Sequence, residues 1–285
     1  MIEKYFDKSK YKAVAFDLDG TLLNNGEVSQ YTLQVLEKLK KHDIHIIIST
    51  GRAFSIIPNS IKQLQVVEFI VSSSGACVTD VSNGNILFKD IMESQVALDV
   101  INILKKFGGT FFVVNSDLAI LTPRFLLHAM RKARKKELER VTDELKEKTK
   151  ITLNLKKLIK NKSLYIEKMN CLFKDINKCR LALDELVSEM AVEAVTTMGE
   201  DIEITSKGID KAKGLQEICN AIGIRIEQIV AFGDSQNDIS MFKSCGYSVV
   251  MANATEEVKA FGDYIAYDAS NDGAANAVKD LFELD

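Results

Sequence analysis

Residues 11–21 read YKAVAFDLDGT, an apolar run that ends at two aspartates, Asp17 and Asp19. A short, continuous apolar run is typical of a strand that is buried on both faces of a sheet. Two uncompensated carboxylates directly after such a strand would be costly, so they need a cation nearby. Because carboxylate oxygens suit hard cations, this stretch indicates a Mg²⁺ site at the end of the strand.

The same pattern, an apolar run followed by polar residues, recurs along the chain. Three further runs have it: residues 44–48 before STGR (49–52), residues 69–71 before SSSG (72–75), and residues 229–232 before GDSQND (233–238). Helical patterns and further strands fill the rest, with helices at 29–42, 210–222, 238–245 and 274–282 and strands at 247–251 and 264–267. This alternation predicts an α/β fold with a Rossmann-like, doubly wound parallel sheet, whose ligand lies at the carboxyl ends of the strands.

The pattern changes between residues 84 and 204. Strand candidates at 85–88, 110–114, 163–169 and 201–205 mix there with helical stretches at 94–107 and 177–190. This mixture predicts an α+β domain inserted into the α/β core. We therefore expect a core of residues 1–83 and 205–285 and an inserted domain of residues 84–204.

Bulk composition limits the class of protein. The chain has 285 residues, 46% of them hydrophobic, and a net charge of −3. No apolar stretch reaches the length of roughly 18 residues that spans a bilayer, so we expect no membrane association. The five cysteines have no C-x-x-C spacing, which argues against a disulfide framework or zinc site and favours the cytoplasm.

One stretch is strongly basic. Residues 131–162 contain thirteen Lys or Arg against five Asp or Glu. Such a run is commonly a solvated helix face, and the alternative is a positive surface that attracts an anionic substrate. The stretch contains no aromatic residue on which bases could stack, so we do not expect a nucleic-acid partner.

Four dispersed motifs together resemble the haloacid dehalogenase superfamily, specifically its Cof-like phosphatase branch with a type IIB (C2B) cap. They are DLDGT (17–21), STGR (49–52), KGIDK (207–211) and GDSQND (233–238). The resemblance covers roughly residues 10–82 and 205–285, and it reaches the inserted domain only through its position and size. It implies a cap domain at 84–204 and a Mg²⁺-dependent phosphatase acting on a small phosphorylated metabolite of the sugar phosphate, pyridoxal phosphate or FMN class.

The resemblance also implies catalytic roles. Asp17 matches the nucleophile that becomes an aspartyl-phosphate, and Asp19 matches the general acid and base. Thr50 matches the hydroxyl that holds a phosphoryl oxygen, and Lys211 matches the cation that neutralises nucleophile and phosphate. The chemistry agrees, because a bare carboxylate would repel an anionic ester without a nearby cation. Lys207 and Lys213 lie close enough in the chain to compete with Lys211 for that role.

Metal and substrate contacts are carried over in the same way. Asp234 and Asp238 match carboxylates of the metal site, to which Asp17 and the backbone carbonyl of Asp19 also belong. Asp238 has the alternative role of a helix N-cap. The implied substrate contacts are Thr50, Lys211, Gly51, Arg52 and Asn237, where Arg52 has the alternative of a packing or surface residue.

Two features leave alternatives open. Relatives commonly have Asn-Gly after the third strand, whereas this chain has Ser74-Gly75, so one supporting contact there is in question. Phosphomannomutases share the core and the DxDGT run, which keeps a phosphomutase as the alternative activity, beside a non-catalytic protein that binds a phospho-ligand. We expect a monomer or a homodimer, and we expect residues of the inserted domain to select the ester.

Overall fold

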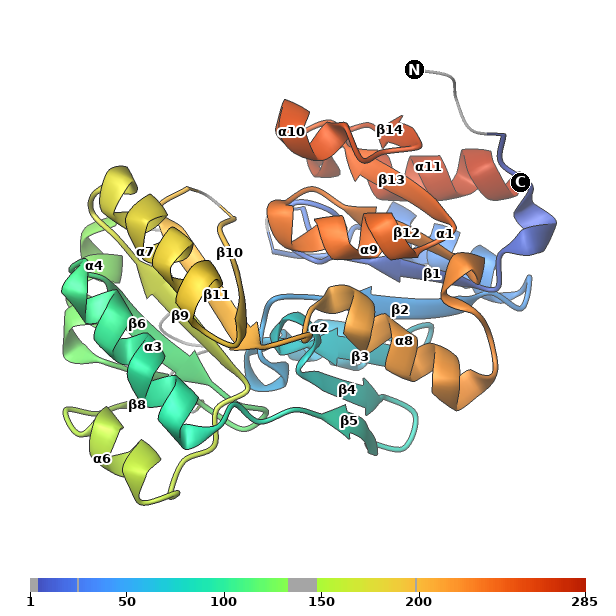
Figure 1. Ribbon diagram of the computed structural model, residues 1–285. Helices are drawn as coiled ribbons and strands as arrows, with labels where there is room; N and C mark the ends of the chain where they lie inside the picture. Colours follow the sequence, from blue (N-terminus) through green and yellow to red (C-terminus); the bar gives the residue numbers. More distant parts are fainter. Residues whose placement is uncertain (1–4, 25, 133–147, 198) are drawn as a thin grey trace. The chain divides into compact units, whose positions relative to one another are not determined.

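The computed structural model describes residues 5–24, 26–132, 148–197 and 199–285 (Figure 1). Its contacts divide the chain into two compact units. The core unit contains Met1–Gly51, Asn59–Phe88 and Lys211–Asp285, and the inserted unit contains Arg52–Pro58 and Lys89–Asp210. Residues 52–58 join the inserted unit because Ala53 packs there against Val114 and Ala119.

The core unit is built on one mostly parallel sheet. Its strands are, in spatial order, β14 (Tyr264–Ala266), β13 (Tyr247–Met251), β12 (Ile229–Gly233), β1 (Ala13–Phe16), β2 (His45–Ser49), β3 (Phe69–Ser72), β4 (Cys77–Asp80) and β5 (Ile86–Lys89). All neighbours from β14 to β3 are parallel, and β4 runs antiparallel to β3. Every residue of β1 and β12 is buried, as the continuous apolar runs predicted.

Helices cover both faces of this sheet (Figure 1). The helices of the core unit are α1 (Gln30–Lys40), α2 (Asn59–Lys62), α8 (Lys211–Ile222), α9 (Ile239–Ser244), α10 (Glu256–Lys259) and α11 (Gly273–Phe282), with 3₁₀ turns η1 (Lys8–Lys10), η3 (Ser73–Gly75), η4 (Ile226–Gln228), η5 (Gln236–Asp238) and η6 (Ala269–Asn271). On one face, Ala15 of β1 shares a buried cluster with Leu215 of α8 and Met241 of α9. On the other, α1 and α11 contact each other, and Tyr31 donates to Asn276. The predicted doubly wound α/β fold is therefore confirmed.

The inserted unit has a second, mixed sheet. Its order is β10 (Val192–Val195), β11 (Asp201–Ser206), β9 (Lys168–Leu172), β6 (Thr110–Val114), β7 (Ala119–Leu121) and β8 (Thr149–Ile151). Its helices are α3 (Ser94–Lys106), α4 (Pro123–Lys132), α6 (Leu155–Lys160) and α7 (Ile176–Glu189), with the 3₁₀ turn η2 (Phe54–Ile56). Buried residues of α3, α6 and α7 form one cluster with the strands β6, β9 and β11, so the unit has its own hydrophobic core.

Two predicted strands of the insertion differ from the structure. The strand predicted at 163–169 begins only at Lys168, because Ile166 and Glu167 make isolated hydrogen bonds to Met92 and Val114 before the ladder with β6 starts. The strand predicted at 85–88 is β5, which pairs in the core sheet and not in the inserted one. Its exposed residues, Ile86 and Leu87, fit the edge position that β5 occupies.

No helix among the described residues is long and apolar enough to cross a membrane. All five cysteines are free, and four of them are buried. Of the basic stretch at 131–162, residues 133–147 lie outside the described residues.

Candidate active site

Three strand ends bring the predicted site residues to one edge of the core sheet. Phe16 of β1 pairs in register with Ile48 of β2 and Phe232 of β12, so the residues that follow these strands come together. The Asp17 amide extends the ladder by donating to the Phe232 carbonyl at 2.9 Å. The parallel register thus fixes the backbone of Asp17, which is 5% exposed.

Lys211 connects two of the predicted carboxylates. It is the first residue of α8, and its Nζ lies 2.7 Å from Asp17 Oδ1 and 2.6 Å from Asp238 Oδ1. Burial by itself lowers the pKa of Lys211, but Asp17 and Asp238 raise it above its ordinary value, so the side chain stays charged. Its competitors pair elsewhere, Lys207 with Glu193 and Lys213 with Glu217, so Lys211 is the lysine that contacts Asp17 and Asp238.

Asp238 organises the loop after β12. Its second oxygen, Oδ2, accepts hydrogen bonds from the amides of Asp234 and Ser235, at 3.0 and 2.9 Å. Gly233 is required beside it, because a Cβ at that position would lie 2.4 Å from Asp238 Cγ. Asp238 therefore closes the turn that precedes α9 while its other oxygen holds Lys211. Its side chain makes no N-cap hydrogen bond to α9, so the alternative role as a helix cap is not confirmed.

Asp234 is held over the same site by neutral donors. Asn253, which follows β13, donates from Nδ2 to Asp234 Oδ2 at 2.9 Å and to the Gly20 carbonyl at 3.0 Å. The Thr21 hydroxyl lies 3.5 Å from Asp234 Oδ1. Gly20 has a φ of +77°, and a Cβ there would lie 2.3 Å from Asp234 Oδ2, so only glycine fits.

Asp17, Asp234 and Asp238 form a cluster that fits a cation. One carboxylate oxygen of each lies within 4.8 Å of the others. Burial raises the pKa of Asp17 well above its usual value, and burial and Asp238 raise the pKa of Asp234 to about 6. Lys211 supplies one positive charge against three carboxylates, so the ionised cluster stays negative. An all-oxygen, net negative site suits a hard divalent cation such as Mg²⁺.

The remaining residues predicted for the site lie outside the carboxylate cluster and differ in burial. Asp19 is exposed, and its carboxylate is not part of the cluster. Thr50 is 1% exposed after β2, and its amide donates to the Val71 carbonyl at 2.8 Å. Asn237 is half-buried in η5. Gly51 is the last residue of the first core segment, whereas Arg52 is grouped with the inserted unit.

Sequence reasoning missed Asn253. The position of Asn253 in the sequence could have predicted this role. It comes two residues after the buried apolar run at 247–251, so it lies at the carboxyl end of another strand of the sheet. Because it holds Asp234, Asn253→Ala is expected to weaken Mg²⁺ binding by about 10–100-fold. The Mg²⁺ dependence of the melting temperature checks this. Asn276→Ala, at an exposed hydrogen bond of α11, is the matched control and should leave Mg²⁺ affinity unchanged.

Stability should depend on pH and Mg²⁺ together. Without metal, the raised pKa of Asp234 stabilises the fold at low pH, and this stabilisation is lost as pH rises through about 6. Because Mg²⁺ would bind the ionised carboxylates, its effect on melting temperature should be small near about pH 5 and larger near about pH 7.5. Melting curves in EDTA and in Mg²⁺ across this range test the expectation. A Mg²⁺-induced rise in melting temperature that does not change with pH, or that persists in Asp234→Asn, would contradict this expectation.

Known proteins give independent comparisons. The model of the haloacid dehalogenase-like hydrolase family matches residues 14–278. Two proteins of Bacillus subtilis (strain 168) are each 26% identical to this chain. One is 5-amino-6-(5-phospho-D-ribitylamino)uracil phosphatase YcsE, with 94% of each chain covered, and the other is phosphatase YwpJ, with 95% of this chain and 99% of the relative covered.

Solved structures show the same fold. A haloacid dehalogenase-like hydrolase from B. subtilis superposes with a TM-score of 0.81 at 22% identity, covering 94% of this chain and 99% of that one. The HAD subclass IIB sugar phosphatase BT4131 gives a TM-score of 0.78 at 22% identity, covering 96% and 100%. Both the core sheet and the inserted sheet therefore have counterparts of known structure.

Proposed function

Because this chain belongs to the haloacid dehalogenase-like hydrolase family, we propose that Asp17 carries the phosphoryl group during hydrolysis of a phosphate ester. The chain is a phosphatase of subclass IIB that acts on small phosphate monoesters. The observation that supports Asp17 as its nucleophile is the buried ion pair with Lys211. Burial raises the pKa of Asp17, and the charge of Lys211 opposes this rise, so the ion pair favours the ionised nucleophile and holds it in place for attack.

In the first half of the proposed reaction, an oxygen of Asp17 attacks phosphorus. The bond between phosphorus and the ester oxygen breaks, and Asp19 gives its proton to the leaving alkoxide. Asp19 follows Asp17 by two residues and is exposed, so its carboxyl is accessible to a bound ester and to water, whereas Asp17 is buried. The Thr50 hydroxyl, the Gly51 amide and Lys211 bind the phosphoryl oxygens in this proposal, and Arg52 and Asn237 contact the substrate.

In the second half, water replaces Asp17 on phosphorus. Asp19, now ionised, takes a proton from the water as it attacks, the bond from Asp17 to phosphorus breaks, and inorganic phosphate leaves. Asp19 therefore gives one proton to the departing alcohol and takes another from water, and the enzyme returns to its starting state.

Mg²⁺ would be held by Asp17 and Asp234 with the Asp19 carbonyl, and Asp238 would support them through the backbone of Asp234 and through Lys211. When bound, the ion supplies positive charge that offsets the repulsion between the carboxylates and the phosphate. Lys211 adds the second positive charge from the protein itself. The remaining positioning comes from Asn253 and Thr21, which fix the Asp234 carboxylate.

The substrates proposed first are phosphate esters of sugars and polyols. YcsE and YitU of B. subtilis, each 26% identical to this chain, are phosphatases of 5-amino-6-(5-phospho-D-ribitylamino)uracil, and BT4131 is a sugar phosphatase. Pyridoxal phosphate and FMN complete the substrate panel. We place the enzyme in the cytoplasm, where its five free cysteines stay reduced.

Phosphate release from that panel tests the proposal. We expect release of inorganic phosphate that requires Mg²⁺ and is lost in EDTA, with one or two esters preferred. The ribityl and sugar esters should release phosphate faster than the other esters of the panel. Phosphate release that EDTA leaves unchanged would overturn the metal assignment, and conversion of a sugar phosphate to its isomer without phosphate release would favour a phosphomutase.

A further inference from the structure

The inserted unit contains a cavity of its own, away from the carboxylate cluster in sequence. Its volume is about 570 Å³, within the range of small-molecule sites. Residues of α3, β6, the start of α4 and the segment 152–157 line it, and all of them belong to the inserted unit. The cavity is therefore complete within that unit.

The wall of the cavity is positively charged. Lys105, Arg124, Lys156 and Lys157 line it, and none of its described lining residues is acidic. Within the part of the chain that the structure describes, Lys105, Arg124 and Lys157 have no carboxylate partner, and Lys156 donates to the neutral Asn102 amide oxygen at 2.6 Å. Lys106, which follows Lys105 but does not line the cavity, pairs with Glu185. The described lining thus gathers four cationic side chains around one cavity without a carboxylate among them.

These cations act on one another. Desolvation, followed by the charges of Lys156 and Arg124, lowers the pKa of Lys105. Like charges held together without a counter-ion are unfavourable, and an anion bound among them removes that repulsion. The N-terminus of α4, at Pro123 and Arg124, lies in the same wall and adds partial positive charge.

The inner surface of the cavity is apolar. Ile101, Phe111 and Leu155 are buried in its lining, and Lys105 Nζ lies 5.9 Å from the centre of the Phe111 ring. The hydroxyls of Thr110 and Thr122 are already used, because they contact His128 and the Phe111 carbonyl. An apolar floor under a cationic wall suits a molecule that carries both an anionic group and a ring.

We propose that this cavity is a second ligand site, which binds a phosphorylated small molecule with its phosphate between Arg124, Lys105 and Lys156 and its ring against Phe111. Arg124 offers the planar guanidinium that pairs with two phosphate oxygens. Lys156 and Lys157 belong to the basic stretch that the sequence singled out, so this part of it has a specific role. The proposal adds a binding site to the phosphatase and does not depend on Asp17.

Isothermal titration of the full-length protein in EDTA tests the site. Without a divalent cation, the three carboxylates of the core site repel phosphates, and no ester is hydrolysed during the titration. The probes are AMP, FMN, adenosine and inorganic phosphate. We expect saturable binding of AMP or FMN, weaker binding of phosphate, and no binding of adenosine, because the charge and the ring both contribute.

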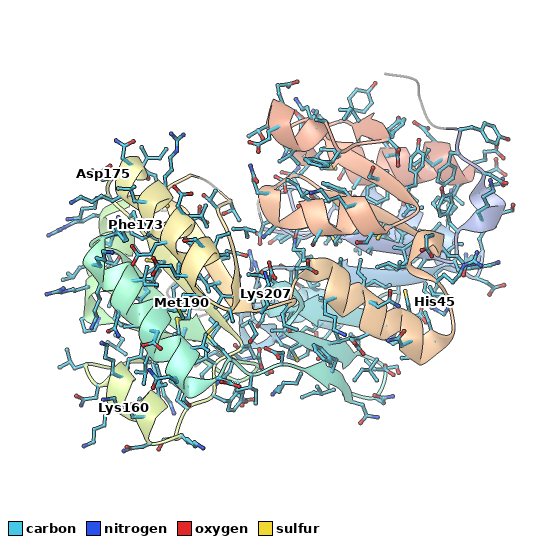
Figure 2. All side chains as sticks on the ribbon, in the orientation of Figure 1. His45, Lys160, Phe173, Asp175, Met190 and Lys207 are labelled. Carbon is cyan, nitrogen blue, oxygen red and sulfur yellow. The ribbon has the colours of Figure 1, made fainter. Side chains whose placement is uncertain are left out.

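Variants locate the binding. Arg124→Ala and Lys156→Ala should each weaken the nucleotide at least tenfold, whereas Lys160→Ala should leave it unchanged. Lys160 is the matched control, because it is an exposed lysine of α6 (Figure 2) and is not among the residues that line the cavity. Phosphate release from the preferred ester should persist in both cavity variants, which separates this site from the proposed catalysis.

Three results would overturn the proposal. The first is the absence of saturable binding for every phosphorylated probe. The second is binding that Arg124→Ala and Lys156→Ala leave unchanged. The third is binding of a single-stranded oligonucleotide at this cavity without binding of AMP or FMN, which would assign it to nucleic acid instead of a small molecule.

Discussion

Asp17→Asn is expected to lower the turnover number by about 10⁴-fold or more while leaving the protein folded. The amide nearly matches the carboxylate in size, so the backbone hydrogen bond from Asp17 to Phe232 should survive. An amide is a very poor nucleophile toward phosphorus, and it also loses the ion pair with Lys211. Burial penalises the charged form of Asp17, so the neutral variant is not expected to melt at a much lower temperature.

Released phosphate and a melting curve, measured on one preparation, check this expectation. Asp280→Asn is the control, because Asp280 is an exposed carboxylate of α11 in the same unit. It should retain full activity. Turnover of Asp17→Asn within tenfold of the parent enzyme, with an unchanged melting curve, would remove Asp17 from its proposed role.

Lys211→Met should damage both stability and activity. Methionine preserves the length of the side chain but leaves Asp17 and Asp238 buried without their shared cation. Removing one partner of a buried ion pair costs about 3–5 kcal/mol at neutral pH. The loss should shrink at low pH, because Asp17, whose pKa burial raises, can then be protonated. Activity should fall by about 10²–10³-fold, since the variant lacks the cation that we propose to bind the phosphoryl oxygens.

Chemical denaturation at two pH values measures the stability part of this prediction. Lys207→Met is the control, since Lys207 is largely exposed and its pair with Glu193 is a surface ion pair, worth about 0–1 kcal/mol. If Lys211→Met were as stable and as active as Lys207→Met, Lys211 would not be the cation of this site.

The core could be predicted because its strands are short, continuous and apolar. Residues 13–16 and 229–233 have no polar side chain that could favour another conformation, and each is followed by a charged residue that ends the run. The helix after Ser29 was equally clear, and the Ser29 hydroxyl accepts from the Thr32 amide as an N-cap. In the core unit, the hydrophobic pattern and the helix cap of the sequence therefore predict the same strands and helix that the packing produces.

The strands of the inserted unit were harder to predict from the sequence, because they form by pairing with segments that are distant in the chain. β7 and β8 have only three residues each. They are strands because β7 pairs with β6 and β8 pairs with β7, and three residues are too few to show a strand pattern in the sequence. The grouping of residues 52–58 with this unit also had no local signal, since Ala53 packs against side chains more than fifty positions away. Such contacts cannot be read from hydrophobic period alone.

Ser74, which replaces the Asn that relatives commonly have, occupies a demanding backbone position. Ser73 and Ser74 both adopt left-handed conformations, with φ of +52° and +54°. Asparagine tolerates this region better than serine, which gives a backbone reason for the relatives' residue. The Ser74 amide still donates to the Thr50 carbonyl at 3.1 Å, so the backbone contact at this strand end is kept.

The most direct test of the central claim is rapid mixing of the Asp19→Ala variant with p-nitrophenyl phosphate and Mg²⁺. Nitrophenolate leaves without a general acid, whereas in the proposed reaction Asp19 is the base for breakdown of the aspartyl-phosphate. We predict a burst of about one nitrophenolate per active site followed by slow turnover, and homoserine at position 17 after borohydride reduction. Turnover without a burst, together with an unmodified Asp17 or a reduced residue elsewhere, would contradict the proposed phosphoryl transfer to Asp17.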